Sequence, residues 1–141
     1  MKNEPFEVVK ESRGLRIIFG DSATKVTEAN KNDIIVNGSH CGANIATGCI
    51  LPSGARGMIG NDAGIGLKNA GIASLKILEE HGVSAAAVAA MSAEVGSGQS
   101  TYYEGVISTV NEVAAKMGVT TGMTAKEAAE KMLDGILEGE E

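Results

Sequence analysis

Short apolar runs alternate with longer amphipathic stretches over most of the chain. The runs at 33–37, 55–60 and 84–91 are each followed by a polar turn that contains glycine or serine, and then by a stretch with helical spacing. Such alternation is typical of βα units, in which helices connect parallel strands. The pattern therefore predicts one compact α/β domain over residues 1–141, with three βα units at 33–117 and a Rossmann-like, mostly parallel sheet.

The helical stretches of these units are expected at about 43–50, 67–81 and 101–117. The second stretch places apolar side chains on one face and charged side chains on the other, and it stops at Gly82. The run at 84–91 is so rich in alanine that a helix is an alternative there. Its length and its flanking turns favour a strand that is buried on both faces.

The two ends of the chain have patterns of their own. Residues 1–20 contain two apolar runs around a polar turn, which predicts a β-hairpin at a sheet edge. Residues 21–32 are polar and aperiodic, and we expect them to form a connection. A last helix is predicted at 124–137, because Thr124 and Glu127 form a capping box that satisfies free amides of the first turn.

Composition narrows the classes of partner. The formal net charge is −6 and the 12 Lys and Arg residues are scattered, so we expect no nucleic-acid partner. Two cysteines, Cys41 and Cys49, are too few for a disulfide scaffold and fit a reducing compartment. The N-terminus lacks the apolar core of a signal peptide, and no apolar run is long enough to span a bilayer. We therefore expect a cytoplasmic protein without a membrane partner.

The abundance of glycine and the scarcity of aromatic residues change the expected packing. The chain has 19 Gly, no Trp and only 3% aromatic residues. The core must then rely on Ala, Val, Ile, Leu and Met, and on backbones that approach one another closely. We expect glycine to mark tight turns between strands and helices.

Polar side chains gather in the three turns that follow the predicted parallel strands. Ligands of open parallel sheets bind outside the carboxyl ends of the strands, where loops converge and helix N-termini present free amides. We therefore expect the polar residues of these turns to line a site for a small-molecule ligand. The candidates are Ser39, His40, Cys41 and Gly42 in the first turn, Asn61, Asp62, Gly64 and Gly66 in the second, and Ser92, Glu94 and Ser97 in the third.

Four of these residues carry groups suited to catalysis. His40 follows a strand and its glycine turn, so its imidazole is a candidate acid or base, with a local hydrogen bond that holds the turn as the alternative. Asp62 could orient His40 or bind a cation, although aspartate is also a favoured helix cap. Cys41 is a candidate nucleophile or a small apolar filler. Glu94 could serve as a second acid or base, or as a metal ligand.

The remaining candidates are suited to substrate binding. Ser39, Ser92 and Ser97 offer hydroxyls, Asn61 offers an amide, and the glycines let an anion approach main-chain amides. The glycines at 64–66 complete neither the dinucleotide fingerprint nor the phosphate-binding loop motif, which argues against a nucleotide ligand. The sequence does not identify a cofactor, and a divalent metal ion is one candidate.

Two resemblances add to this picture. Residues 34–44, IIVNGSHCGAN, resemble the strand-to-loop signature VNGHGGN of creatininase-like amidohydrolases, in which the histidine helps to form a divalent-metal site. This resemblance implies that His40 is a metal ligand, although a serine here separates Gly38 from the histidine. From GSHCG through NDAGIG, the chain also resembles a family of small bacterial and archaeal α/β proteins of uncharacterised activity.

We therefore expect an enzyme of hydrolase or lyase type that acts on a small polar or carboxylated metabolite, with His40 as acid or base and Asp62 orienting it. The alternative is a non-catalytic binding or regulatory module that holds an anion in the glycine-rich turns. A third hypothesis is a homo-oligomer in which a partner copy completes the cleft. The proposed catalytic centre requires that the three turns meet in one place.

Overall fold

A computed structural model describes residues 6–139, apart from the side chains of Leu67 and Lys68. Its centre is a six-stranded mixed sheet. The strands are β1 (Phe6–Ser12), β2 (Leu15–Gly20), β3 (Ile34–His40), β4 (Gly57–Asn61), β5 (Ser84–Val88) and β6 (Ile107–Val110). They lie in the sheet in the same order as in the chain.

The pairing directions confirm an α/β fold with an N-terminal hairpin. β1 pairs with β2, and β5 with β6, in antiparallel fashion, whereas the strands from β2 to β5 are joined by parallel pairings. A doubly wound Rossmann sheet reverses its strand order at one point. Because the described strands show no such reversal, the Rossmann-like part of the expectation is not confirmed.

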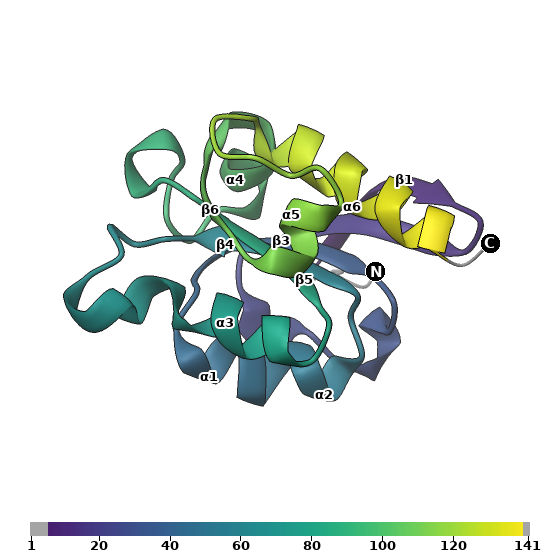
Figure 1. Cartoon of the computed structure of the whole chain (residues 1–141), viewed down its shortest axis with the longest axis horizontal. Helices are drawn as coiled ribbons and strands as arrows, with labels where there is room; N and C mark the ends of the chain where they lie inside the picture. The colour runs from purple at the N-terminus through teal and green to yellow at the C-terminus, as the bar shows by residue number, and fades with distance from the viewer. Residues whose placement is uncertain (1–5, 140–141) are drawn as a thin grey trace, which may run out of the picture.

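Helices cover both faces of the sheet (Figure 1). The α-helices are α1 (Ala43–Ile45), α2 (Leu51–Ser53), α3 (Ala73–Glu80), α4 (Gly98–Glu104), α5 (Glu112–Lys116) and α6 (Ala125–Gly139). Short 3-10 helices are η1 (Ala23–Lys25), η2 (Glu28–Asn30), η4 (Leu67–Ile72) and η5 (Ala90–Ser92), and η3 (Ala46–Ile50) is a π-helical turn.

The connections explain which face each helix covers. Right-handed crossovers between parallel strands that follow one another in order place their helices on the same face. Accordingly, α1, α2 and α3 lie on one side of the sheet, and only after β5 does the chain pass to the other side, where α4 and α6 pack (Figure 1).

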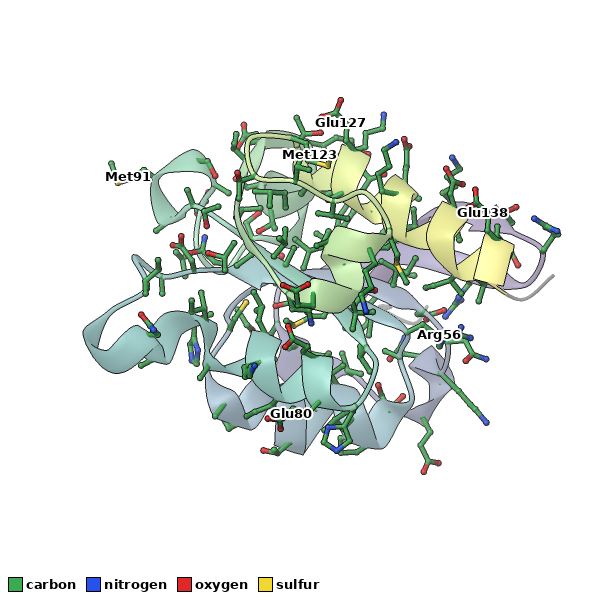
Figure 2. The ribbon with its side chains drawn as sticks, in the orientation of Figure 1. Arg56, Glu80, Met91, Met123, Glu127 and Glu138 are labelled. Atoms are coloured by element: carbon green, nitrogen blue, oxygen red, sulfur yellow. The ribbon has the colours of Figure 1, made fainter. Side chains whose placement is uncertain are left out.

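Two apolar layers, one on each side of the sheet, form the core. Successive residues of a strand point to opposite faces, so Ile34 and Val36 belong to the layer that contains α6, and Ile35 belongs to the layer that contains α3. The outer faces are polar, and Figure 2 shows Glu80 of α3 and Glu127 of α6 directed into solvent. Among the described helices, none is long and apolar enough to cross a membrane.

One predicted helix is wrong. The stretch at 101–117 contains the end of α4, the edge strand β6 and α5 instead of a single helix. Its middle part includes Val106, Ile107, Thr109 and Val110, and such β-branched residues favour a strand that pairs with a neighbour. The pattern of apolar positions alone did not separate this short strand from the helices that flank it.

The helix expected at 67–81 begins later than predicted. Residues Leu67–Ile72 form η4, and the α-helix α3 covers Ala73–Glu80. Asn69 has a φ of 61°, which is a left-handed conformation that a right-handed α-helix does not accommodate.

The C-terminal helix begins where the capping box predicts. Thr124 Oγ1 accepts a hydrogen bond from Glu127 N at 3.1 Å, and Glu127 Oε1 accepts one from Thr124 N at 2.9 Å. The helix then extends to Gly139, slightly beyond the predicted end.

Contacts at glycine bring α4 and the preceding loop against the ends of β2 and β3. A Cβ atom on Gly38 would overlap the backbone of Gly96 and Ser97, and one on Gly98 would overlap the backbone of Gly20. Backbone atoms cannot move aside as a flexible side chain can, so both positions require glycine. The expected dependence of packing on close backbone approach is met here.

Gly38→Ala should lower the free energy of unfolding, because the added methyl group meets backbone atoms of the loop before α4. Overpacking of this kind costs about 1–3 kcal/mol. Gly48→Ala is the matched control, since Gly48 lies in the helical turn η3 and a Cβ atom there has no neighbour within 4 Å. Urea denaturation should show a loss for Gly38→Ala and an unchanged or higher stability for Gly48→Ala. Equal stability of the two variants would contradict the close contact.

Candidate functional site

The carboxyl ends of β3, β4 and β5 bring the polar turns to one edge of the sheet. His40 ends β3 and is paired with Asn61 at the end of β4, which is paired with Val88 of β5. The loop after β5 returns toward β3, where Gly96 N donates to Gly38 O at 2.8 Å. Because β4 lies between these two strands in the sheet, the loop spans the width of β4. This loop and the segment after β4 project from the same end of the molecule (Figure 1).

The Asp62 side chain joins the segments of this edge, and the residue is only 5% exposed. Its Oδ1 accepts hydrogen bonds from Gly64 N at 2.8 Å and from Ala90 N at 3.0 Å, and its Oδ2 accepts one from the Ser108 hydroxyl at 2.6 Å. These bonds tie the end of β4 to its own turn, to the segment after β5 and to β6. Among the described residues there is no hydrogen bond between Asp62 and His40, so the structure does not support the expectation that Asp62 orients His40.

Sequence reasoning missed two residues of this edge, Ser108 and Asp21. Ser108 lies in β6, within the stretch that was predicted to be helical. Asp21 follows β2, and its Oδ1 accepts a hydrogen bond from Gly98 N at 3.0 Å. The position of Asp21 directly after a strand was the available signal, because β2 is a parallel neighbour of β3 and ends at the same edge.

The His40 side chain is exposed, and one of its ring nitrogens is already used. Gly42 N donates a hydrogen bond to His40 Nδ1 at 2.9 Å. A neutral imidazole has one N–H and one acceptor nitrogen, so with Nδ1 as the acceptor the ring proton lies on Nε2. His40 therefore presents an N–H donor. A general base would need a lone pair on Nε2, so this tautomer supports a role as hydrogen-bond donor and not the base role.

Cys41 faces the core and not the edge. It is fully buried in the layer that contains Ile45 and Leu78, and burial raises the pKa of its thiol to about 12. The nucleophilic form of cysteine is the thiolate, so the expected role of Cys41 as a nucleophile is wrong, and the alternative of a small apolar filler holds. Adjacent residues of an extended chain point to opposite sides, which explains why His40 is exposed and Cys41 is not.

The third turn is held by its own hydrogen bonds. Glu94 is exposed, and its backbone N donates to Ser100 Oγ at 2.8 Å. Ser92 Oγ donates to a carbonyl of its own turn at 2.7 Å and accepts from Val106 N at 2.9 Å. Ser97 Oγ caps α4 by accepting from Ser100 N at 3.0 Å. The hydroxyls of Ser92 and Ser97 therefore serve the loop itself, and the Glu94 side chain is the exposed acidic group of this turn.

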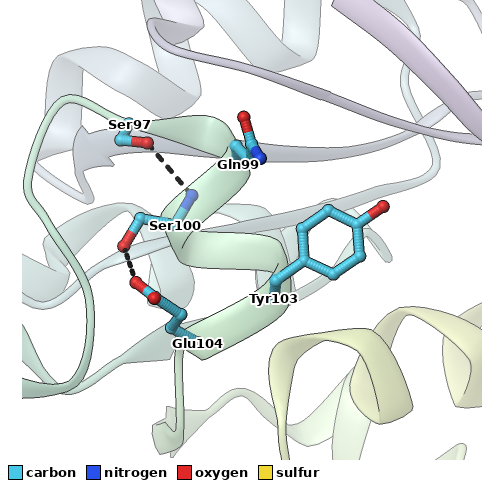
Figure 3. A pocket seen from close by; sticks show the side chains of 5 residues that line it. All are labelled: Ser97, Gln99, Ser100, Tyr103 and Glu104. Carbon is cyan, nitrogen blue, oxygen red and sulfur yellow. Dashed lines mark hydrogen bonds between the residues drawn. The ribbon is translucent and has the colours of Figure 1, made fainter.

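Ser97 also lines a hollow beside α4, together with Gln99, Ser100, Tyr103 and Glu104 (Figure 3). Ser100 Oγ donates to Glu104 Oε1 at 2.6 Å, and Ser97 Oγ accepts from Ser100 N. Three of the five lining side chains are thus bonded within one short helix, which leaves the Gln99 amide and the Tyr103 phenol as the polar groups open to a ligand.

Ser39 and Gly42 position the end of β3. Ser39 Oγ accepts a hydrogen bond from Ala23 N at 3.0 Å, and Ser39 N donates to Asn37 Oδ1 at 3.0 Å. Gly42 N is used by His40. Of the groups expected to bind substrate at these two residues, the O–H and the second lone pair of the Ser39 hydroxyl remain available, whereas Gly42 N does not.

The glycine turn after β4 is wound in the left-handed sense. The φ angles of Ala63, Gly64, Ile65 and Gly66 are 51°, 74°, 69° and 76°, a region that a β-branched residue rarely adopts. Gly64 N donates to the Asp62 carboxylate, and Gly66 N donates to Gly64 O at 2.8 Å. Contrary to expectation, the amides of Gly64 and Gly66 are therefore not free to receive an anion.

Asn61 differs from the other candidates because one of its polar atoms is buried without a partner. The residue is 0% exposed, and its Oδ1 accepts a hydrogen bond from Ala63 N at 2.7 Å. Its Nδ2 has no hydrogen-bond partner among the described residues. An unpaired buried donor costs about 1–3 kcal/mol, so this amide is the most unusual polar group at the edge.

A metal site at His40 finds no support in the described part of the chain. No group of three or more His, Cys, Asp or Glu side chains there is placed to hold a metal ion. The metal-ligand role that the resemblance to creatininase-like amidohydrolases implied for His40, and the one considered for Glu94, therefore lack further ligands among the described residues.

Comparisons with known proteins found no relative. No family model, no curated protein and no solved structure matches the chain. Function must therefore be inferred from the side chains at the carboxyl edge of the sheet.

Two replacements of Asp62 should show whether its hydrogen bonds or its charge stabilise the edge. Asp62→Ala leaves Gly64 N, Ala90 N and the Ser108 hydroxyl without their acceptor, and a hydrogen bond to a charged group contributes about 1.5–3 kcal/mol. Asp62→Asn keeps an oxygen for the amides and offers an N–H to Ser108. We expect urea denaturation to show a large loss for Asp62→Ala and a small one for Asp62→Asn; equal losses would mean that the charge, and not the hydrogen bonds, holds the edge.

Thiol labelling should distinguish the two cysteines. Cys49 is partly exposed and Cys41 is buried, and burial raises the pKa of both thiols. With a disulfide-exchange reagent, we expect the native protein to react at Cys49 first and at Cys41 only on unfolding. Cys49→Ser should abolish the native-state reaction, whereas Cys41→Ser should keep it. Rapid labelling of native Cys49→Ser would contradict the burial of Cys41.

Proposed function

We propose that this chain binds a small polar or carboxylated molecule at the carboxyl ends of β3 and β4, with His40 as a hydrogen-bond donor to it. The observation that supports the proposal most strongly is the exposed His40 ring, whose Nδ1 accepts from Gly42 N and whose proton is thereby held on Nε2. A fixed N–H donor at a strand end suits a ligand that carries oxygen acceptors.

The place of His40 in the sheet supports the same proposal. Open α/β sheets bind their ligands outside the carboxyl ends of the parallel strands, and His40 ends one of the inner parallel strands. We propose that this sheet is used as Rossmann-like sheets are, with the loops after β4 and β5 forming the walls around the ligand.

An enzyme of hydrolase or lyase type is the second candidate. A neutral imidazole that donates from Nε2 polarises a carbonyl oxygen, and this is the form that the Gly42 amide favours in His40. Cys41 and Asp62 do not supply a nucleophile or base, because the thiol is buried and the carboxylate is engaged. The exposed Glu94 is then the candidate base for activating water.

Thermal denaturation in the presence of small carboxylates, amides and amines should test binding. A ligand that binds the native state raises its stability by RT ln(1 + [L]/Kd). We expect at least one carboxylate to raise the Tm of the wild type and of His81→Ala, and to have no such effect on His40→Ala. His81 is a suitable control because it is exposed and follows the last residue of α3. It lies in the connection that leads to the amino end of β5, and not in a turn at the carboxyl edge.

The two candidate functions differ in the fate of the stabilising compound. If the compound persists unchanged after long incubation with the protein, binding is favoured; if its NMR signals are replaced by those of products, the enzyme is favoured. Equal stabilisation of wild type and His40→Ala by every compound would exclude His40 from the site.

A further inference from the structure

The orientation of the Asn61 side chain is fixed by a backbone contact. Ala63 N donates to Asn61 Oδ1 at 2.7 Å. Because an amide N–H can only donate, the side-chain atom that faces it must be the oxygen. The other end of the side chain is therefore the NH2 group, and this assignment does not depend on any further neighbour.

The NH2 group lies in a place where the protein supplies no acceptor for it. Asn61 is 0% exposed, and its Nδ2 has no partner among the described residues. Two carbonyls of the neighbouring strands each accept another bond: Val88 O accepts from Asp62 N at 2.9 Å, and Gly38 O accepts from Gly96 N at 2.8 Å. Natural structures pair the great majority of buried polar groups, so an unpaired donor here requires an explanation.

The position of Asn61 connects its amide to the proposed ligand site. Asn61 is the last residue of β4 and stands opposite His40, the last residue of β3. Neighbouring strands lie about 4.8 Å apart, so the two residues are next to each other at the carboxyl edge of the sheet.

We infer that Asn61 is the residue that determines ligand specificity at this site, because its Nδ2 donates a hydrogen bond to an oxygen atom of the ligand. The inference rests on the proposed function and adds the chemical class of the ligand. Both His40 Nε2–H and Asn61 Nδ2–H are donors, and a carboxylate offers two oxygens with about four lone pairs to receive them. An ammonium group offers only donors, so it would leave the Asn61 amide unpaired.

Titration of isotope-labelled wild-type protein with three probes of similar size tests this inference directly. The probes are acetate, acetamide and methylammonium, each added at constant ionic strength. We expect acetate to shift the Asn61 side-chain NH2 resonances and the His40 ring resonances together and to saturation. Acetamide should shift them with lower affinity, since it has one acceptor oxygen, and methylammonium should shift neither.

Two variants separate the hydrogen bond from the charge. Asn61→Asp keeps an oxygen for Ala63 N and removes the donor, so we expect acetate to bind at least about 10-fold more weakly, corresponding to 1.4 kcal/mol. Asn44→Asp is the matched control, because Asn44 is exposed near Gly42 and receives the same added charge without the loss of a buried donor. We expect its acetate affinity to change far less.

The outcomes distinguish this inference from the proposed function. If acetate moves the His40 signals and leaves the Asn61 NH2 signals unchanged, the inference is wrong and the proposed function stands. If acetate moves neither, both are wrong. If Asn61→Asp does not fold, the titration of the wild type still decides. The inference is overturned if the Asn61 NH2 protons contact only a tightly held water and respond to none of the probes.

Discussion

The carboxylate of Asp62 makes the contacts on which the carboxyl edge of the sheet depends. A buried charge is tolerated only where donors satisfy it, and here the donors come from its own turn, from the segment after β5 and from β6. The loops that follow β4 and β5 are therefore joined to each other through one side chain. Because Asn61 immediately precedes Asp62, the same bonds hold the end of β4 in the register that places Asn61 opposite His40.

The hydrogen bonds of Asp62 also stabilise a turn that is costly by itself. Residues held in sparsely populated backbone regions cost about 1–3 kcal/mol each, and Ile65 has a φ of 69°. Asp62 accepts from Gly64 N through its carboxylate and from Ile65 N through its carbonyl, at 2.8 Å and 2.6 Å. On the other side of β4, Gly38 allows the loop before α4 to approach at backbone distance. The edge is thus shaped by main-chain contacts more than by large side chains, as a chain poor in aromatic residues requires.

The parts of the fold that could be predicted are those that local patterns determine. The hairpin, the buried alanine-rich strand and the capping box at Thr124 follow from alternation, flanking turns and local hydrogen bonds. β6 could not be predicted in this way, because a short strand between two helices has no clear period and is stabilised by its pairing with β5. Ser108, the hydrogen-bond partner of Asp62, could not be predicted either, because it lies in β6. The two residues are 46 positions apart, and local residue spacing does not indicate such a contact.

The same distinction applies to the candidate site. That the turns after β3 and β4 share one edge follows from parallel strands, and the structure brings His40 and Asn61 together. What each side chain does depends on burial and on which donors are near it, and neither can be read from residue type. Cys41 and His40 are neighbours in sequence, yet one is fully buried and the other is exposed.

The hydrogen bond at His40 decides what kind of chemistry this edge can support. In a catalytic triad, a carboxylate accepts a hydrogen bond from Nδ1–H, which leaves the lone pair of Nε2 as the base. Here Nδ1 accepts from Gly42 N, so the arrangement is inverted and Nε2 becomes the donor. The Asp62 carboxylate is already engaged, so the ends of β3 and β4 present N–H donors, and the exposed Glu94 is the carboxylate of this edge that stays accessible. In a chain with a net charge of −6, the proposed binding of an oxygen-bearing ligand thus relies on directed N–H groups and not on a cluster of cationic side chains.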